Sequence, residues 1–380
     1  MDQSDLELFR DTVIRFLREE VEPHYESWER QGRIPPEFYL SMGENGLLCV
    51  DQPEEYGGIG APFEFSMVVL EEVSRAGYMA LASNLTVHSD IVAPYILHLG
   101  TEEQKQHYLP RMASGECIGA IGMTEPGAGS DLANIRSRAT PTEDGGWVVN
   151  GGKTFITNGQ NAGVVCAAIK TAPDKGSKGV SLLLLDTDLP GFERGRNLEK
   201  IGQHAADTSE LFFKDLKIPA GKLLGREGGG FGHMMDELPR ERLGLALTAV
   251  AHARGAVERT LNYVQERQAF GQAIGSFQNT RFSLAKARAE VECHWAFIEK
   301  GIAQYQKGEL TAVDAAMIKY TTTELENRVC DQCLQLFGGY GYMLEYPISR
   351  DFVDARIQRI YGGTSEIMLE IIARSLLGRS

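Results

Sequence analysis

The spacing of apolar residues divides this chain into three parts, and the first part has the spacing of helices. Up to about residue 112, apolar side chains recur at steps of three and four, which places them on one face of a helix. Such stretches lie at 6–17, 67–73 and 91–99, and proline and glycine cluster between them, for example at 53–62. The pattern predicts a helical N-terminal domain over residues 1–112.

The second part has shorter apolar runs that fit strands. Residues 147–149 read WVV and follow DGG at 144–146, a combination typical of a hairpin turn that enters a strand. Further apolar runs of strand length, separated by turn residues, lie at 164–169, 180–185, 211–213 and 216–218. We therefore expect a middle β domain, a barrel or a sandwich, over residues 113–225.

Helical spacing returns after the consecutive glycines at 228–230. Its longest stretches lie at 243–264, 282–297 and 315–336. Three or four long helices imply a C-terminal four-helix bundle over residues 226–380. Because helical and strand segments do not alternate, their order favours an α+β chain that is mainly α and argues against a doubly wound sheet.

Composition narrows the class of protein further. The 380 residues carry a formal net charge of −14, which argues against a nucleic-acid partner, and no apolar run approaches the roughly 20 residues of a membrane span. The six cysteines do not suggest a disulfide framework, and the eight histidines are too scattered for a metal site. The acidic start is neither a signal peptide nor an Arg-rich transit peptide. These features predict a soluble protein without stable membrane insertion, cytoplasmic if bacterial, or of the mitochondrial matrix if eukaryotic with a removed transit peptide.

Two segments carry a specific resemblance to a known family. Residues 123–131 read MTEPGAGSD, and residues 359–367 read RIYGGTSEI. They resemble the two signature segments of the acyl-CoA dehydrogenase family of flavoproteins, and the order and spacing of further motifs agree over essentially the whole chain. The resemblance implies an FAD cofactor and a homotetramer whose subunits contain the three domains described above.

The resemblance also implies which residues of the β domain line the flavin. Met123 and Thr124 would meet the ring system of FAD, Phe155 would pack on it, and Thr157 would hydrogen-bond near its N5 atom. Ser130 would contact the pantetheine arm of the substrate.

A second group of residues is implied to reach FAD from a neighbouring subunit. In the family, the segment that matches RQAFGQ at 267–272 reaches the diphosphate and adenine of the neighbour's cofactor. A guanidinium pairs with phosphate oxygens in a bidentate manner, which suits Arg267 to this role. The other residues of these segments that the resemblance implies as FAD contacts are Phe270, Phe277, Gln278, Gln335, Gly338 and Gly339. Thr364 and Glu366 match family contacts that close over the flavin.

The catalytic base is the point at which this chain departs from many members of the family. Those members carry a glutamate directly after the tyrosine that matches Tyr361, whereas this chain has Gly362. The segment around Glu241 resembles the helix that carries the base in the long-chain and isovaleryl-CoA branches, which place Gly or Ala after the tyrosine. Glu241 is therefore the expected base, with Glu237 one helical turn earlier as the alternative. Without the resemblance, the commoner role of such a glutamate is a solvated helix carboxylate paired with a neighbouring arginine.

The resemblance implies substrate contacts as well. Arg242 would order the substrate-binding helix and the CoA arm, and Tyr361, Gly362 and Gly363 would contact the substrate. The main-chain N–H of Gly362 and a ribityl hydroxyl of FAD would hold the thioester oxygen as enolate charge develops. The segment 82–95 is expected to line the pocket for the acyl tail.

The reaction implied is α,β-dehydrogenation of an acyl-CoA thioester to the trans-2-enoyl-CoA. Glu241 would remove the α-proton, flavin N5 would accept the β-hydride, and an electron-transfer flavoprotein would receive the electrons. Two alternatives stay open at this point: a fold relative that uses oxygen, such as an acyl-CoA oxidase or a flavin-dependent monooxygenase, and a non-catalytic flavoprotein that binds acyl-CoA. The branch resemblance covers both straight long acyl chains and branched short ones.

Overall fold

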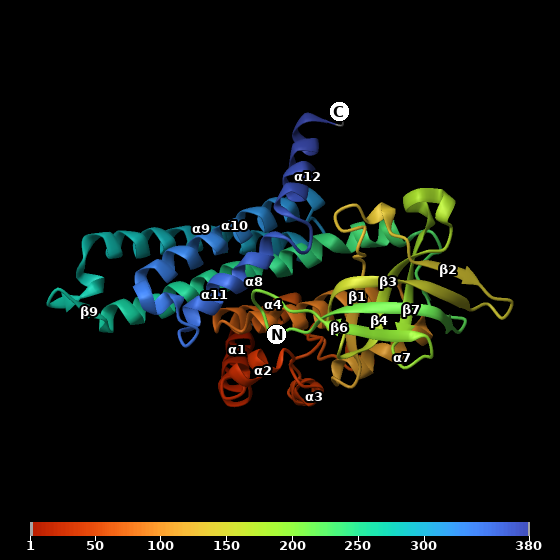
Figure 1. Ribbon diagram of the computed structural model, residues 1–380, viewed down its shortest axis with the longest axis horizontal. Helices are drawn as coiled ribbons and strands as arrows, with labels where there is room; N and C mark the ends of the chain where they lie inside the picture. Colours follow the sequence, from red (N-terminus) through yellow and green to blue (C-terminus); the bar gives the residue numbers. More distant parts are fainter. Residues whose placement is uncertain (1–2, 379–380) are drawn as a thin grey trace.

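The computed structural model describes residues 3–378 and confirms the three-part α+β architecture (Figure 1). In Figure 1 the sheet lies on the right, the bundle of long helices extends to the left, and the first helices of the chain lie below. One helix, α8 (Gly230–Glu266), starts next to the sheet and runs through the bundle, and it carries Glu241. Between residues 3 and 378, no helix is long and apolar enough to cross a membrane.

The N-terminal domain consists of helices that bury their apolar faces in a shared core. The stretches with helical spacing form α1 (Gln3–Phe16), α4 (Phe63–Arg75) and α6 (Ala93–Leu99), so these predictions are confirmed. A π-helical turn, η3 (Thr86–Val92), leads directly into α6. The other elements of this domain are η1 (Leu17–Val21), α2 (Tyr25–Gln31), α3 (Pro36–Glu44), η2 (Glu54–Tyr56), α5 (Met79–Leu85) and α7 (Glu102–Ala113).

The middle domain is an eight-stranded sheet in the order β6-β7-β3-β2-β4-β5-β8, with β1 paired to β4. The predicted strands at 147–149, 164–169 and 180–185 are confirmed as parts of β3 (Trp147–Thr157), β4 (Ala162–Lys170) and β5 (Val180–Asp186). The remaining strands are β1 (Ile118–Gly122), β2 (Arg138–Pro141), β6 (Phe192–Asn197), β7 (Thr208–Ile218) and β8 (Leu223–Leu224), with η4 (Leu132–Asn134) and η5 (Pro173–Gly179) between them.

The separation of the apolar runs at 211–213 and 216–218 by a turn is wrong, because both belong to β7. Asp215, which lies between the runs, has a φ of 47°. Its N–H donates to Asn150 Oδ1 at 2.9 Å, and Asn150 Nδ2 donates to Asp215 Oδ1 at 3.0 Å. The register of β3 against β7 shifts at this point, so the polar pair forms a bulge within one strand.

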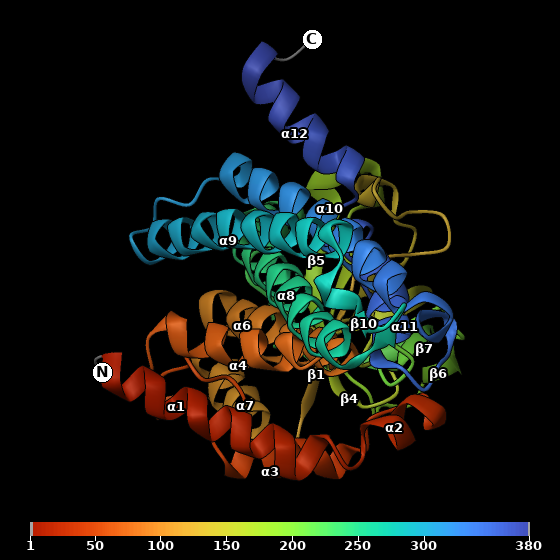
Figure 2. The same cartoon turned by 90° about the vertical axis from the view of Figure 1, so that its left-hand side faces the viewer.

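The C-terminal domain is a bundle of α8, α9 (Gln278–Gln306) and α10 (Ala312–Phe337), joined by the shorter α11 (Pro347–Ala355). A small hairpin of β9 (Gln268–Ala269) and β10 (Gln272–Ala273) connects α8 to α9 at the end of the bundle far from the sheet (Figure 1). The last helix, α12 (Ser365–Leu377), projects away from the body (Figure 2). The short turns of this domain are η6 (Ile274–Ser276), η7 (Gly338–Tyr342) and η8 (Arg356–Arg359).

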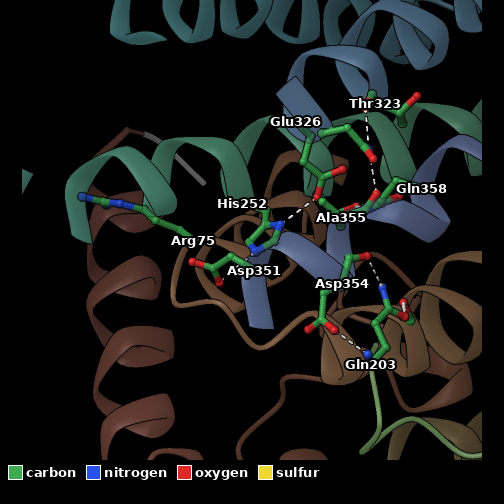
Figure 3. A network of polar contacts seen from close by, with 12 residues as sticks. Arg75, Gln203, His252, Thr323, Glu326, Asp351, Asp354, Ala355 and Gln358 are labelled. Carbon is green, nitrogen blue, oxygen red and sulfur yellow. Dashed lines mark hydrogen bonds and ion pairs between the residues drawn. The ribbon is translucent and has the colours of Figure 1, made fainter. Parts of the chain in front are cut away.

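A buried polar network ties α8, α10 and α11 together (Figure 3). His252 of α8 lies between two carboxylates: its Nδ1 is 2.7 Å from Glu326 Oε1 and its Nε2 is 3.1 Å from Asp351 Oδ1. Asp351 also accepts a hydrogen bond at 2.8 Å from Arg259, and the N–H of Gln203 donates to Asp354. The imidazole side chain and both of its carboxylate partners are fully buried. The network therefore fixes the helices that carry the candidate site.

The charge of His252 makes the stability of this bundle dependent on pH. Burial lowers the pKa of His252, but the hydrogen bonds and charges of Asp351 and Glu326 outweigh it and raise the pKa to about 9. A histidine whose pKa is raised in the folded state stabilises fully below its unfolded pKa of about 6.5, and this contribution is lost as the pH rises through about 9. In thermal melts, the difference in Tm between the wild type and His252→Gln should therefore shrink from about pH 6 to about pH 9.5. A difference that stays constant over this range would show that the imidazole is not charged in the folded protein.

Candidate active site

Glu241 lies inside the protein, so the interpretation of this residue as a solvated helix carboxylate is wrong. The residue is 6% exposed, and its Oε1 accepts a hydrogen bond at 2.8 Å from the hydroxyl of Tyr95 on α6. Burial raises the pKa of Glu241 to about 7, although the hydrogen bond from Tyr95 and the charge of Arg242 lower it. A carboxylate with a pKa near neutrality is suited to accept a proton from carbon and to release it again.

The alternative base, Glu237, has a different environment one helical turn earlier. Its Oε1 is 2.9 Å from Nδ1 of His98, a residue whose side chain is 43% exposed. Glu237, whose side chain is 12% exposed, is thus paired with a partly exposed histidine, whereas Glu241 is bonded to a fully buried tyrosine. The geometry favours Glu241.

The loop that follows Tyr361 is held by two buried cations. Arg242 Nε donates to the carbonyl oxygen of Gly362 at 3.2 Å, and Lys319 Nζ donates to the carbonyl oxygen of Gly363 at 2.7 Å. Burial lowers the pKa of Lys319 to about 8. Both glycines have positive φ angles, 65° and 98°. Because Arg242 directly follows Glu241, the same turn of α8 presents the candidate base and anchors this loop.

The backbone and surroundings of Gly362 disfavour the side chain that many family members carry at this position. A Cβ atom added to it would lie 2.4 Å from Cδ1 of Leu245, and its φ of 65° would strain any other residue. Since Leu245 is also on α8, this helix fills the space of the missing carboxylate with an apolar side chain and supplies a carboxylate one turn earlier.

The residues expected to line the flavin come together at β3. The N–H of Thr154 donates to the carbonyl oxygen of Thr124 at 3.0 Å, which joins the loop after β1 to the segment that contains Phe155. The buried Lys153 supports this loop through hydrogen bonds to Met123 O at 3.2 Å and Glu125 Oε1 at 2.8 Å. Phe155 is 66% exposed and has a φ of 59°. A large aromatic side chain held outward on strained backbone is a fitting platform for the flat ring system of FAD.

The other residues expected near the flavin and the substrate are less closely tied together. Ser130 is exposed, and Thr157 is half-buried at the end of β3. Thr364 caps α12 by accepting a hydrogen bond from Ile367 N, and Glu366 is exposed in the first turn of that helix. The hydroxyl of Tyr361 is 3.4 Å from Ser83 Oγ.

The residues expected to hold the diphosphate and adenine lie around a separate pocket at the opposite end of the bundle. A cavity of about 530 Å³ is lined by residues that include Arg267, Gln335, Gly338 and Gly339. The two glycines have open space beside their backbone, as a phosphate-binding segment requires. Phe270 is 96% exposed at the tip between β9 and β10.

The positions of these two groups have a direct consequence for the cofactor. The tip that carries Phe270 and Arg267 lies at one end of the molecule, and the sheet that carries Phe155 lies at the other (Figure 1). Phe277 belongs to the same end as Phe270, with their rings 6.1 Å apart, and Gln278 begins α9 beside it. The residues expected to hold the diphosphate and adenine therefore lie at the end of the chain opposite to those expected to line the flavin.

Leu245 and Lys319 were not expected in the site from the sequence, and Tyr95 was expected only as the last residue of the segment 82–95 that lines the acyl pocket. Lys319 could have been noticed in the sequence, because it is a charged residue on the apolar face of α10, four positions after Ala315. The partnership of Tyr95 with Glu241 had no signal, because 146 positions separate them.

Comparisons with known proteins agree with this architecture along the whole chain. Models of the N-terminal, middle and C-terminal domains of acyl-CoA dehydrogenases match residues 3–116, 120–216 and 228–377. The mitochondrial long-chain specific acyl-CoA dehydrogenase of Sus scrofa is 44% identical over 377 residues, which cover 98% of this chain and 87% of that protein. The crystal structure of an acyl-CoA dehydrogenase from Geobacillus kaustophilus has 45% sequence identity and a TM-score of 0.96, with 99% of both chains covered. The crystal structure of a glutaryl-CoA dehydrogenase from Mycobacterium smegmatis in complex with FADH2 has 29% identity and a TM-score of 0.92, covering 100% of this chain and 96% of that one.

The chain therefore belongs to the acyl-CoA dehydrogenase family, and the resemblance seen in the two signature segments is confirmed. It is an oxidoreductase of a flavoprotein family that uses FAD, acts on acyl-CoA and typically forms tetramers.

Proposed function

We propose that this enzyme converts an acyl-CoA thioester to the trans-2-enoyl-CoA with Glu241 as the base that removes the α-proton. One observation carries the assignment: a buried carboxylate with a pKa raised to about 7 shares a turn of α8 with Arg242, which anchors Gly362. Leu245 occupies the space that a carboxylate at position 362 would need.

The residues of the chain have separate roles in this reaction. When bound, FAD supplies the acceptor for the hydride that leaves the β-carbon. Glu241 accepts the proton from the α-carbon, and the electron pair of that C–H bond forms the new double bond. The N–H of Gly362 donates to the thioester oxygen and stabilises the enolate charge in the transition state. The cationic side chains of Arg242 and Lys319 hold the loop in place for this hydrogen bond.

We also propose that the enzyme works as a homotetramer in which neighbours complete each other's FAD site. The two groups of FAD residues at opposite ends of one chain support this arrangement (Figure 1). Exposed apolar side chains at the bundle end and on α12 also favour contacts with other copies. They include Phe270, Tyr342, Leu344, Leu376 and Leu377.

A reduction assay tests the proposed reaction. The purified protein should carry about one FAD per chain, and under anaerobic conditions its flavin should bleach with acyl-CoA substrates. A panel of straight and methyl-branched acyl-CoAs defines the preferred chain, and the product should be the trans-2-enoyl-CoA. Turnover should be supported by an electron-transfer flavoprotein. Rapid peroxide formation in air would instead identify an oxidase, and a flavin that no acyl-CoA reduces would refute the proposed reaction.

A further inference from the structure

One hydrogen bond connects the candidate base to a helix from the N-terminal domain. The hydroxyl of Tyr95 donates to Glu241 Oε1 at 2.8 Å, and Tyr95 is completely buried. Among the hydrogen bonds of residues 3–378, no other one reaches this carboxylate. We propose that Tyr95 is the positioning residue of the base: it holds Oε1 and thereby leaves Oε2 to take the α-proton. This inference rests on the proposed function of Glu241.

The neighbouring residues prevent Tyr95 and Glu241 from moving apart. Arg240, directly before Glu241, donates to Asp90 O at 3.4 Å and lies 3.5 Å from Asp90 Oδ1. Asp51 Oδ2 accepts a further hydrogen bond from Arg240 at 2.8 Å. Two adjacent residues of α8 are thus bonded to the segment formed by η3 and α6, at Asp90 and at Tyr95. A group held in this way is pre-organised, because its orientation is fixed before the substrate binds.

The backbone that precedes Tyr95 has a feature that is common at functional sites. The π-helical turn η3 (Thr86–Val92) immediately precedes α6, and π-helical turns are frequent at functional sites. Pro94 follows η3 without a break in the helical backbone, and because proline has no N–H it cannot donate a hydrogen bond to a carbonyl oxygen of that turn. These features set the direction in which α6 presents the Tyr95 side chain toward α8.

Tyr95 remains a donor at neutral pH. Burial, together with the charge of Glu241, raises the pKa of Tyr95 well above its ordinary value, so the phenol keeps its proton. A hydrogen-bond donor stabilises an ionised carboxylate more than a protonated one. The bond therefore favours the form of Glu241 that accepts a proton.

The effect of Tyr95 on Glu241 can be tested separately from the effects of the other titratable groups around this carboxylate. Arg242 and Glu237 act from α8 with opposite effects on the carboxylate, and Glu237 is itself paired with His98. From β4, Cys166 faces the same carboxylate, and burial raises the pKa of its thiol to about 12, so it stays neutral. Removal of the Tyr95 hydroxyl leaves these charges in place and changes one hydrogen bond.

The decisive variant is Tyr95→Phe, which keeps the ring and removes the donor. Since the ionised carboxylate loses a hydrogen bond, the pKa of Glu241 should rise, and the acid limb of the kcat/KM profile should move up by about one pH unit. On the alkaline plateau, kcat should fall about tenfold, because the base is no longer held in one orientation. Infrared difference spectra report the protonation of Glu241 directly, because the carboxyl band of this residue is the one that disappears in Glu241→Gln. The pKa obtained by titrating this band should rise in the same way, and the measurement does not require turnover.

A second variant and a matched control separate positioning from packing. With 3-fluorotyrosine at position 95, the phenol is more acidic and donates more strongly, so the acid limb should move to lower pH. If Tyr95→Phe does not fold, the fluorotyrosine variant alone tests the proposal. Tyr108→Phe is the control, because Tyr108 is also buried but its hydroxyl donates to Asp186 Oδ1 at 2.6 Å. Its pH profile should match that of the wild type.

The outcomes distinguish this inference from the proposed function. If Glu241→Gln is inactive but both Tyr95 variants have the pH profile and infrared titration of the wild type, Glu241 is the base and the role of Tyr95 is refuted. If Glu241→Gln keeps normal turnover, the base assignment fails, and the inference about Tyr95 fails with it. Opposite shifts for phenylalanine and fluorotyrosine, with Tyr108→Phe unchanged, would establish Tyr95 as the positioning residue.

Discussion

Glu241→Gln should lose most of the turnover while it keeps the fold and the cofactor. Glutamine matches glutamate in size and can still accept the hydrogen bond that Tyr95 donates at 2.8 Å, but it cannot accept the α-proton. Loss of a general base typically lowers the rate by roughly 10²–10⁴-fold, and we expect kcat to fall at least that far. Stopped-flow measurement of flavin reduction by a good acyl-CoA substrate gives the rate of the chemical step directly.

The control for this variant is Glu237→Gln, in the glutamate one turn earlier that pairs with His98. It should keep turnover within a few-fold of the wild type, and both variants should carry FAD and bind acyl-CoA. Gly362→Glu should not rescue Glu241→Gln, because the φ of 65° at this position would strain a glutamate and the side chain of Leu245 would have to move. Near-normal flavin reduction in Glu241→Gln, with its FAD content verified, would overturn the assignment and direct attention to Glu237.

The fold could be predicted to a large extent because local patterns determine most of its elements. The apolar spacing over 243–264 and 315–336 follows from one buried face on each of α8 and α10, and the structure has both helices. The error at β7 arose because Lys214 and Asp215 look like turn residues. What keeps them in a strand is the side chain of Asn150 on β3, a partner that local spacing does not reveal.

The candidate site could be predicted in its motifs but not in its contacts. Gly362 and Glu241 stood out through the resemblance to the family, because the branches that place Gly or Ala after the tyrosine carry their base on the helix that matches Glu241. The residues that surround them did not stand out, since Leu245 and Tyr95 look like ordinary core residues. Their roles depend on which helices are neighbours, and that is set by tertiary packing.

Pairs of defective subunits should restore each other's activity if the FAD site is shared between chains. Arg267→Glu places a negative charge beside the expected diphosphate, so the affinity of homo-oligomers of this variant for FAD should fall more than tenfold. Glu241→Gln homo-oligomers should bind FAD but not turn over. In a co-expressed mixture, a chain with an intact Glu241 can meet a neighbour with an intact Arg267, and that combination makes one complete site.

The expected recovery follows from random pairing of the two variants. Half of the chains carry an intact Glu241, and half of their neighbours carry an intact Arg267, so about a quarter of the wild-type activity should return. Mixed oligomers isolated with two different affinity tags provide the sample, and activity per chain is the measurement. If Arg267 served the FAD of its own chain, every site would still lack either its base or its cofactor, and the mixture would stay as inactive as its components. The position of Arg267 at the end of the bundle opposite the sheet argues for recovery (Figure 1).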